Sequence, residues 1–427
     1  MKLKRELGLI SLVLYGIGVI VGAGIYSLIG IGAGLAGDML WLAFLIAGAI
    51  AFFTAMSYAE LSPIIPYEAA EYRIVERASG SRTLSFIIGW TTAIAHILFA
   101  STVALAFAGY LSAMSGIPPT SLAVAVVLCM GGMNFLGLRL SSLYNDICAV
   151  VSVLGLVIIA VLALASPGGS KADLLLPPQG GLSSIVAAVA IIFFAFIGFE
   201  NVANITEEAK DSRRSVPLAM ILSLVVSTAL YCIVSVAALS LSGWRELAGS
   251  SAPLSLVATR SVIDLSPLLS VIALLATSNT VLIALISSSR MLFGISRSGA
   301  LPRIFSSLGG KGTPWFSAAI TTLLAVLAVM FLDIRTSAEL TNSGIFISYL
   351  AVNLSLVILR PKKAGIAGPR VLGFPVLAFL GALSSLAMLV YIGIELWPYQ
   401  LIIIACGVVV LFLHRERDSE EKNRIRR

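Results

Sequence analysis

Long apolar stretches dominate this sequence and recur along the whole 427-residue chain, with short polar connections between them. Hydrophobic residues make up 59% of the chain and charged residues only 11%. A helix needs about 20 apolar residues to cross the hydrocarbon core of a bilayer. The pattern therefore predicts an all-α integral membrane protein that crosses the membrane many times.

We expect twelve membrane spans, including two after the first ten that form a separate pair. They cover approximately residues 8–31, 38–62, 84–112, 118–137, 141–165, 183–208, 216–241, 263–297, 314–332, 337–359, 372–395 and 398–414. The first ten spans define an expected transporter core over residues 1–360. Residues 361–427 then hold spans eleven and twelve and a basic tail.

The placement of the basic residues predicts the orientation. With the N-terminus inside, all but four of the 28 Lys and Arg residues fall in the tails and loops on the inner side. Cytoplasmic loops carry such an excess of Lys and Arg. We expect a multi-pass cell-membrane protein with both termini in the cytoplasm. Its net charge of +7 then reflects topology and not nucleic-acid binding.

Two of the spans are interrupted by glycine near their middle. The first interruption is at residues 22–24, and the second is at residues 197–200. Lipid cannot satisfy the backbone groups that a broken helix exposes, so such breaks occur beside protein, water or a polar ligand. Each broken span opens a unit of five spans, which predicts a 5+5 inverted repeat. The alternative is that these glycines only allow helices to pack closely.

The direction of the helix dipoles predicts what the breaks would bind. A half-helix that begins near Ala23 would point the free N–H groups of Ala23, Gly24 and Ile25 at a carboxylate. A half-helix that ends near Phe194 to Ile197 would offer carbonyls to an ammonium group or a small cation. Together the two breaks would form a receptor for a zwitterion.

Five ionisable groups in or beside the spans are candidates for gating or coupling. Glu200 is a carboxyl near mid-membrane and could carry a proton, or remain a structural protonated carboxyl. His96 could sense pH, or be a neutral histidine that is bonded to a carbonyl. Glu207 and Glu208 end span six, where they could form an ion-pair gate with Arg290 or a solvated loop.

Enzyme and cofactor signals are weak in this chain. Residues 32–37 match GxGxxG by letter, but they follow a membrane span and not a strand. The four cysteines show no CxxC spacing, so neither a metal centre nor a disulfide framework is indicated. We therefore expect no enzyme activity, no cofactor and no bound metal apart from a possible coupling ion.

Several motifs resemble the amino acid-polyamine-organocation superfamily of permeases. They are Gly22-Ala23-Gly24-Ile25 in span one, Ala59-Glu60-Leu61-Ser62-Pro63 after span two, Phe193 to Glu200 with Glu207 to Pro217 around span six, and Arg290 with Ser296 to Pro302 after span eight. The resemblance covers spans one to ten. It implies the leucine-transporter-like fold, in which helices 1 and 6 are broken.

The resemblance also implies a substrate site. The substrate carboxylate would meet backbone at Ala23 and Gly24, with Ile25 beside them. The ammonium would meet carbonyls at Ile20, Phe194 and Ile197, around Ala195. The ring of Phe194 would also serve as a gate over the occupied site.

Two positions depart from the family pattern. Ala69-Ala70 stand where a Gly-Gly pair usually follows span two. Ser152 stands where some proton-coupled members carry a lysine in span five, so that mechanism is not available here. Ser278 and Thr280, with Asn279 between them, could instead supply oxygens to sodium, and a proton on Glu200 or plain exchange remain open.

These observations predict a secondary active amino acid transporter that works by alternating access. Neutral or broad-range amino acids and a proton as coupling ion are the expected partners, besides the lipid bilayer. The alternatives are an amino acid/polyamine exchanger, a sodium-coupled symporter, or a non-transporting nutrient sensor on the same scaffold. The sequence does not indicate an oligomeric state.

Overall fold

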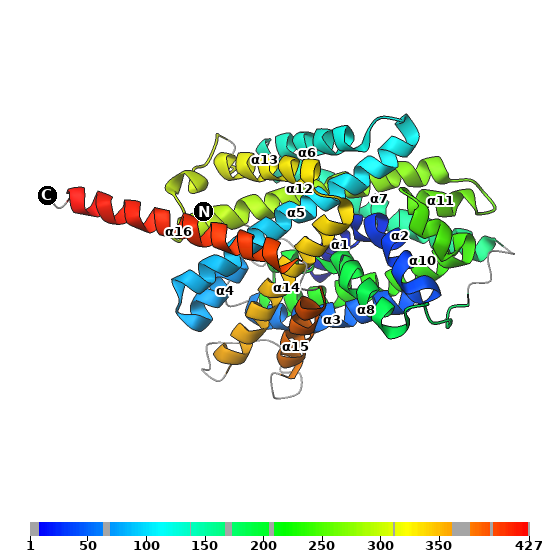
Figure 1. The fold of residues 1–427 in the computed structure, drawn as a ribbon, viewed down its shortest axis with the longest axis horizontal. Coiled ribbons are helices and arrows are strands. Elements are labelled where there is room, and N and C mark those ends of the chain that lie inside the picture. Colours follow the sequence, from blue (N-terminus) through cyan, green and yellow to red (C-terminus); the bar gives the residue numbers. More distant parts are fainter. Residues whose placement is uncertain are drawn as a thin grey trace.

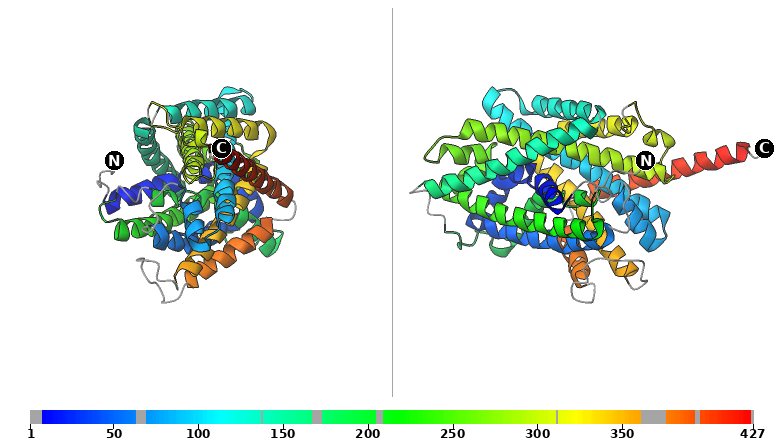
Figure 2. Two further views of the ribbon diagram at one scale, coloured as in Figure 1. Left: turned by 90° about the vertical axis from the view of Figure 1, so that its left-hand side faces the viewer. Right: turned by 180° about the vertical axis from the view of Figure 1, so that it is seen from behind.

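The fold is a bundle of long helices, most of which run along its long axis, whereas α14 (Ile334–Leu359) and α15 (Val376–Ile392) run across it (Figure 1). This computed structural model describes residues 8–62, 69–136, 138–166, 173–204, 209–310, 312–360, 376–392 and 396–425. Every element assigned within these ranges is helical, as predicted. Two views of the other sides show the same bundle, with α15 on its outside and α16 (Trp397–Ile425) projecting beyond it toward the C-terminus (Figure 2).

The helices follow the predicted spans closely. The first half contains α1 (Leu9–Ile20), α2 (Ala23–Ala36), η1 (Gly37–Met39), α3 (Leu40–Leu61), α4 (Ala70–Ser79), α5 (Arg82–Ser115), α6 (Pro119–Phe135) and α7 (Leu138–Ala165). The second half contains α8 (Gly181–Ile192), η3 (Phe193–Phe196), α9 (Asn201–Asn204), α10 (Ser212–Gly249), α11 (Pro253–Thr259), α12 (Ser266–Arg297), η5 (Arg303–Ser306), α13 (Trp315–Phe331) and α14 (Ile334–Leu359). Two further helices follow, α15 (Val376–Ile392) and α16 (Trp397–Ile425).

Among the described residues, seven helical stretches are long and apolar enough to cross a membrane, and five further apolar helices have 10–17 residues. The shorter helices have two physical origins. α1 and α8 are halves of broken spans, whereas α6, α13 and α15 have 17 residues each. At 1.5 Å per residue, 17 residues reach roughly 26 Å, nearly the thickness of the hydrocarbon core.

The molecule carries its apolar surface outside and many polar side chains inside. Leu164 is 90% exposed and Phe331 is 78% exposed, whereas Thr102, Asn342 and Asn353 are fully buried. Buried polar groups are satisfied by bonds between helices, such as Ser57 Oγ to Asn353 Oδ1 at 2.6 Å. This arrangement is the one expected when lipid surrounds the bundle and the site lies within it.

Helix α4 lies at one end of the bundle and α11 at the opposite end (Figure 1). α4 follows Ala69, whose φ of 58° and ψ of 53° place it in the left-handed region. Glycine adopts that region without steric cost, whereas alanine does not. Ala69 therefore takes a conformation that glycine would adopt with less strain.

Replacing Ala69 by glycine is expected to be tolerated, because relief of left-handed strain offsets the added freedom of the unfolded chain. The free energy of unfolding should change by less than about 0.5 kcal/mol. Ala70 is the matched control, since it is the first residue of α4 and its replacement by glycine should be destabilising by up to about 1 kcal/mol. Thermal unfolding in detergent measures the stability of both variants. Equal losses of stability would show that the backbone at Ala69 is not strained.

Candidate substrate and coupling site

The first broken span is interrupted at Val21 and Gly22. α1 ends at Ile20, and α2 begins at Ala23 with Gly22 as its N-cap. The break was predicted at residues 22–24, and the structure places it one residue earlier because Ala23 and Gly24 already belong to the first turn of α2. That turn lacks intrahelical partners for its N–H groups. Ala23, Gly24 and Ile25 are thus the predicted donors at the positive end of a helix dipole.

The second broken span unwinds more gradually. α8 ends at Ile192, a 3₁₀ turn covers Phe193–Phe196, and Ile197 is extended. Gly198 has a φ of 125°, which in practice only glycine adopts, and a Cβ there would approach Val19. The glycine therefore turns the chain against the first broken span before α9 begins at Asn201.

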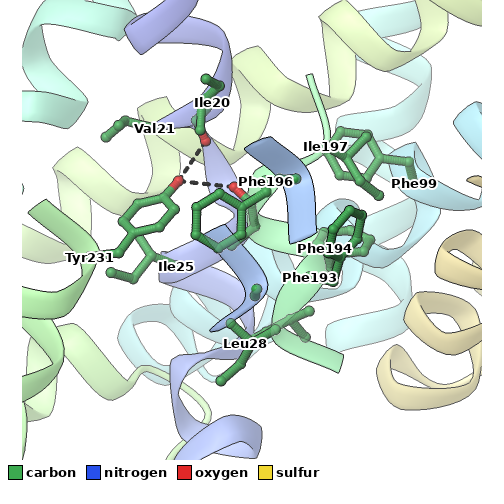
Figure 3. Close-up of a cluster of buried hydrophobic side chains, with 14 of the residues drawn as sticks. Ile20, Val21, Ile25, Leu28, Phe99, Phe193, Phe194, Phe196, Ile197 and Tyr231 are labelled. Atoms are coloured by element: carbon green, nitrogen blue, oxygen red, sulfur yellow. Dashed lines mark hydrogen bonds between the residues drawn. The ribbon is translucent and has the colours of Figure 1, made fainter. Parts of the chain in front are cut away.

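The two breaks touch each other. A Cβ added at Gly24 would overlap the Cα of Ala195, so the start of α2 lies directly on the unwound segment. The Tyr231 hydroxyl on α10 lies 2.6 Å from the carbonyl oxygen of Ile20 and 3.1 Å from that of Ala195. This fully buried tyrosine bonds to both breaks at once (Figure 3).

Aromatic rings surround the junction of the breaks (Figure 3). The ring of Phe194 packs on Phe99 of α5, with centroids 4.5 Å apart, and the ring of Phe196 packs on Tyr231 at 5.3 Å. Ile20, Ile25 and Ile197 complete an apolar surface, and all three are buried. The residues predicted for substrate contact are thus brought together, with Phe194 positioned between α5 and the unwound segment.

The carbonyls of the second broken span have protein partners as well. Asn342 Nδ2 on α14 donates to the carbonyls of Ala190 and Ile191 at 2.6 and 3.3 Å. The carbonyl of Phe194 accepts the N–H of Ile197 at 3.3 Å. An ammonium group would therefore compete with the Ile197 N–H for the carbonyl of Phe194 and with the Tyr231 hydroxyl for that of Ile20. Neither Asn342 nor Tyr231 was predicted from the sequence, because their partners lie far along the chain.

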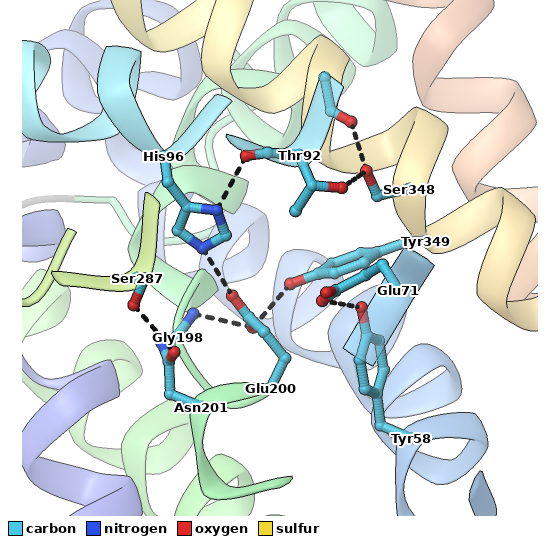
Figure 4. Close-up of polar contacts among 11 residues, drawn as sticks. Tyr58, Glu71, Thr92, His96, Gly198, Glu200, Asn201, Ser287, Ser348 and Tyr349 are labelled. Carbon is cyan, nitrogen blue, oxygen red and sulfur yellow. Dashed lines mark hydrogen bonds and ion pairs between the residues drawn. The ribbon is translucent and has the colours of Figure 1, made fainter. Parts of the chain in front are cut away.

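Glu200 lies beside the junction and is held from several elements (Figure 4). Its Oε2 accepts the N–H of Gly198 at 3.0 Å and the hydroxyl of Tyr349 on α14 at 2.9 Å. Its Oε1 lies 3.8 Å from Nε2 of His96 on α5. The exposed fraction of the glutamate is only 4% and that of the histidine 5%. Glu200 and His96, predicted separately, therefore form one buried pair.

The bonding of His96 determines what that pair can hold. Its Nδ1 lies 2.9 Å from the carbonyl oxygen of Thr92, and a carbonyl can only accept, so Nδ1 carries a proton. In the neutral ring, Nε2 then turns a lone pair toward Glu200 Oε1, which lies 3.8 Å away. Among the described residues neither atom has a hydrogen-bond partner, although both are buried. A proton between the two side chains would give both atoms a partner.

The proposed sodium oxygens are not brought together. Ser278 Oγ bonds the hydroxyl of Tyr144 on α7 at 2.7 Å, whereas Thr280 Oγ1 lies against Gly22 at the first break. Residues two apart on a helix point in different directions. Asn279 bonds Asn145 of α7 at 3.0 Å.

The other predicted gating residues occupy separate places. Ser152 is buried, its hydroxyl donates to the carbonyl of Cys148 at 2.6 Å, and its own carbonyl accepts the Tyr26 hydroxyl at 2.7 Å. Arg290 lies on α12 and is half-buried. Glu207 and Glu208 lie outside the described residues, so the ion-pair gate remains a prediction.

The end of the bundle near α11 is bonded to the first broken span. The Tyr110 hydroxyl on α5 donates to the carbonyl of Tyr26 at 3.1 Å and accepts the N–H of Leu254 in α11 at 3.3 Å. A single buried hydroxyl thereby connects α2, α5 and α11.

Comparison with known proteins agrees with this architecture. Residues 7–411 match the model of the amino acid permease family, which is nearly the whole chain. This chain belongs to the amino acid permease family. It is a multi-pass membrane protein and a secondary amino acid transporter, not an enzyme.

Relatives of this permease have different named substrates. It is 29% identical to the branched-chain amino acid permease BcaP of Bacillus subtilis (strain 168), over 98% of this chain and 95% of the relative. It is 28% identical to the methylthioribose transporter of the same organism, with the same coverage of both chains. Cationic amino acid transporter 4 of Homo sapiens is 27% identical over 85% of this chain, which spans 61% of that relative. The family is therefore clear, whereas the substrate must be argued from the site.

Removing the hydroxyl in a Tyr231→Phe permease is expected to weaken substrate binding about tenfold. The ring remains between Phe44 and Phe196, but the carbonyls of Ile20 and Ala195 lose their donor, which costs about 1–3 kcal/mol. Ligand-induced shifts in melting temperature measure the affinity. Tyr391→Phe is the control, because its hydroxyl bonds Ser183 on the exposed surface. Unchanged affinity in Tyr231→Phe would contradict the link between this bond and the site.

Proposed function

We propose that this permease takes up neutral amino acids with apolar side chains, together with protons. The observation that carries the substrate class is the wall of Phe99, Phe194 and Phe196 with Ile25 and Ile197 at the junction of the breaks. Such a wall favours an aliphatic side chain, since burying each methylene contributes about 0.8 kcal/mol. The similarity to a branched-chain amino acid permease supports the same class.

The two breaks would bind the carboxylate and ammonium groups of the substrate. The first turn of α2 at Ala23, Gly24 and Ile25 would receive the carboxylate, since free N–H groups and the dipole both favour an anion. The carbonyls near Ile20, Phe194 and Ile197 would receive the ammonium. Phe194 would cover the bound substrate, because its ring already lies against Phe99 of α5.

A cationic substrate is the second candidate, because the chain is also similar to a cationic amino acid transporter. A cationic side chain needs an opposite charge when it is desolvated. The carboxyl nearest the junction, Glu200, already binds Gly198 and Tyr349 and faces His96. This environment favours a neutral substrate.

The proton would be held by the Glu200 and His96 pair. The pair would share one proton between two buried side chains, and Glu200 bonds Gly198 of the second break. Occupation of the break by substrate would therefore alter the surroundings of the proton site directly. The excess of Lys and Arg in alternate loops supports placing both termini, and α4, on the cytoplasmic side.

Uptake of labelled amino acids into proteoliposomes tests this function. We expect saturable uptake of leucine, isoleucine and valine, with competition by other apolar amino acids and at least tenfold weaker competition by arginine and lysine. Methylthioribose should be tested as well, because a relative is named for it. Strong competition by arginine with none by leucine would reject the neutral class.

A further inference from the structure

A second carboxyl group is buried near the Glu200 and His96 pair. Glu71 lies in the first turn of α4, outside the membrane spans, yet its exposed fraction is only 5%. Its Oε1 accepts the hydroxyl of Tyr58 on α3 at 2.8 Å. A buried carboxyl on a connecting helix is unusual, because glutamate is almost never fully buried without a partner.

Glu71 and Glu200 are connected through two tyrosines (Figure 4). Tyr58 binds Glu71, Tyr349 binds Glu200, and the two tyrosine rings meet edge to face with centroids 5.8 Å apart. α4 packs on both α5 and α14, which carry His96 and Tyr349 respectively. Four titratable side chains around Glu71 interact with it. They are Tyr58, His96, Glu200 and Tyr349.

Burial raises the pKa of Glu71 above its usual range. The backbone N–H groups of its own turn, the His96 ring and the Tyr58 hydroxyl lower the pKa, whereas the Glu200 charge raises it further. Two carboxyls that interact in this way do not ionise independently, so a proton on one favours ionisation of the other.

The two carboxyls also differ in their routes to water. Glu200 is buried beside Gly198 of the second broken span. Glu71 belongs to α4, which lies at one end of the bundle (Figure 1). Arg73 and Glu76, on the same short helix, pair at 3.3 Å and are partly exposed. The carboxyl of Glu71 is thus buried, although partly exposed side chains stand two and five residues further along the same helix.

We propose that Glu71 is the inner proton acceptor of the permease, which takes the proton from Glu200 after the substrate has left and passes it to the cytoplasm. A water molecule that enters the site after the substrate has left relays the proton: the O–H bond at Glu200 breaks, one at Glu71 forms, and the negative charge moves from Glu71 to Glu200. Water then takes the proton from Glu71. This inference rests on the proposed proton coupling and adds a residue to it.

Glu71→Gln separates net proton-driven transport from exchange. In proteoliposomes with an inward proton gradient, accumulation of leucine should fall at least tenfold, because the proton has no carboxyl to accept it on the inner side. Exchange of internal for external leucine at equal pH should fall less than threefold, since the proton need not leave in that cycle. Glu76→Gln on the same helix is the matched control and should retain both activities.

Two outcomes would overturn the inference. If wild-type protein accumulates leucine with a proton gradient and Glu71→Gln does so equally well, Glu71 is not the acceptor. If accumulation and exchange fall by the same factor, Glu71 only anchors α4. A wild-type protein that ignores the proton gradient would instead reject the proposed coupling itself.

Tyr58→Phe provides a second test if the Glu71→Gln protein does not fold. The Tyr58 hydroxyl favours the ionised carboxyl of Glu71, so its removal raises the pKa of Glu71 further. The pH profile of gradient-driven uptake should therefore move toward higher pH by about half a unit or more. A pH profile identical to that of the wild type would contradict the role of Glu71.

Discussion

Replacement of Glu200 by glutamine is expected to abolish gradient-driven accumulation of the amino acid, with at least a tenfold loss. The glutamine oxygen can still accept the N–H of Gly198 and the Tyr349 hydroxyl, and its amide can donate to His96 Nε2. The variant therefore imitates the protonated carboxyl and cannot release a proton. Uptake should also lose its dependence on external pH.

Accumulation of leucine under an imposed proton gradient measures this effect, with exchange at equal pH measured on the same vesicles. Glu339→Gln is the control. The Glu339 carboxyl pairs with Arg335 at 2.9 Å, and this ion pair is not part of the breaks. Wild-type accumulation in Glu200→Gln would show that the coupling proton does not reside on this carboxyl.

A methyl group at Gly24 is expected to remove substrate binding. The added Cβ would meet the Cα of Ala195, so the backbone of the second broken span must move. Overpacking of this kind typically costs about 1–3 kcal/mol of stability. The junction between the first turn of α2 and the unwound segment would open, and the predicted carboxylate site lies on that turn.

The measurement compares melting temperatures with and without leucine, so that loss of binding is separated from loss of fold. Gly24→Ala should melt at a lower temperature and show no shift with leucine at concentrations that saturate the wild type. Gly132→Ala is the matched control, because a Cβ at Gly132 of α6 meets open space and alanine favours a helix. A normal leucine shift in Gly24→Ala would remove the first break from the site.

The sequence predicted the fold and the two breaks because both leave local signals. The length of an apolar stretch indicates a span, and glycines inside the stretch indicate a break. The breaks at Gly22 and Gly198 could therefore be predicted without knowing which residues they contact. Tyr231 could not be identified in this way, since it bonds Ile20 from 211 residues away. The sequence around a tyrosine in an apolar helix does not indicate which backbone carbonyl its hydroxyl will bond.

The burial of Glu71 could also have been predicted from the sequence. Its helix, α4, also carries Arg73, Glu76 and Arg77, so the buried carboxyl stands among charged residues that are exposed or partly exposed. The apolar residues Ile74, Val75 and Ala78 stand three, four and seven positions after Glu71, which places all four on one face of the helix. The structure buries that face and leaves Arg73 and Glu76 partly exposed. A charged residue on an apolar face is a readable signal.

The central claim is that substrate at the two breaks and a proton at Glu200 and His96 cross the membrane together. Proton entry measured with a trapped pH indicator during leucine uptake tests this most directly, in proteoliposomes without an imposed pH gradient. We predict internal acidification that starts with leucine addition, saturates with leucine concentration, and is absent in Glu200→Gln. Saturable leucine uptake without any proton entry would contradict the account.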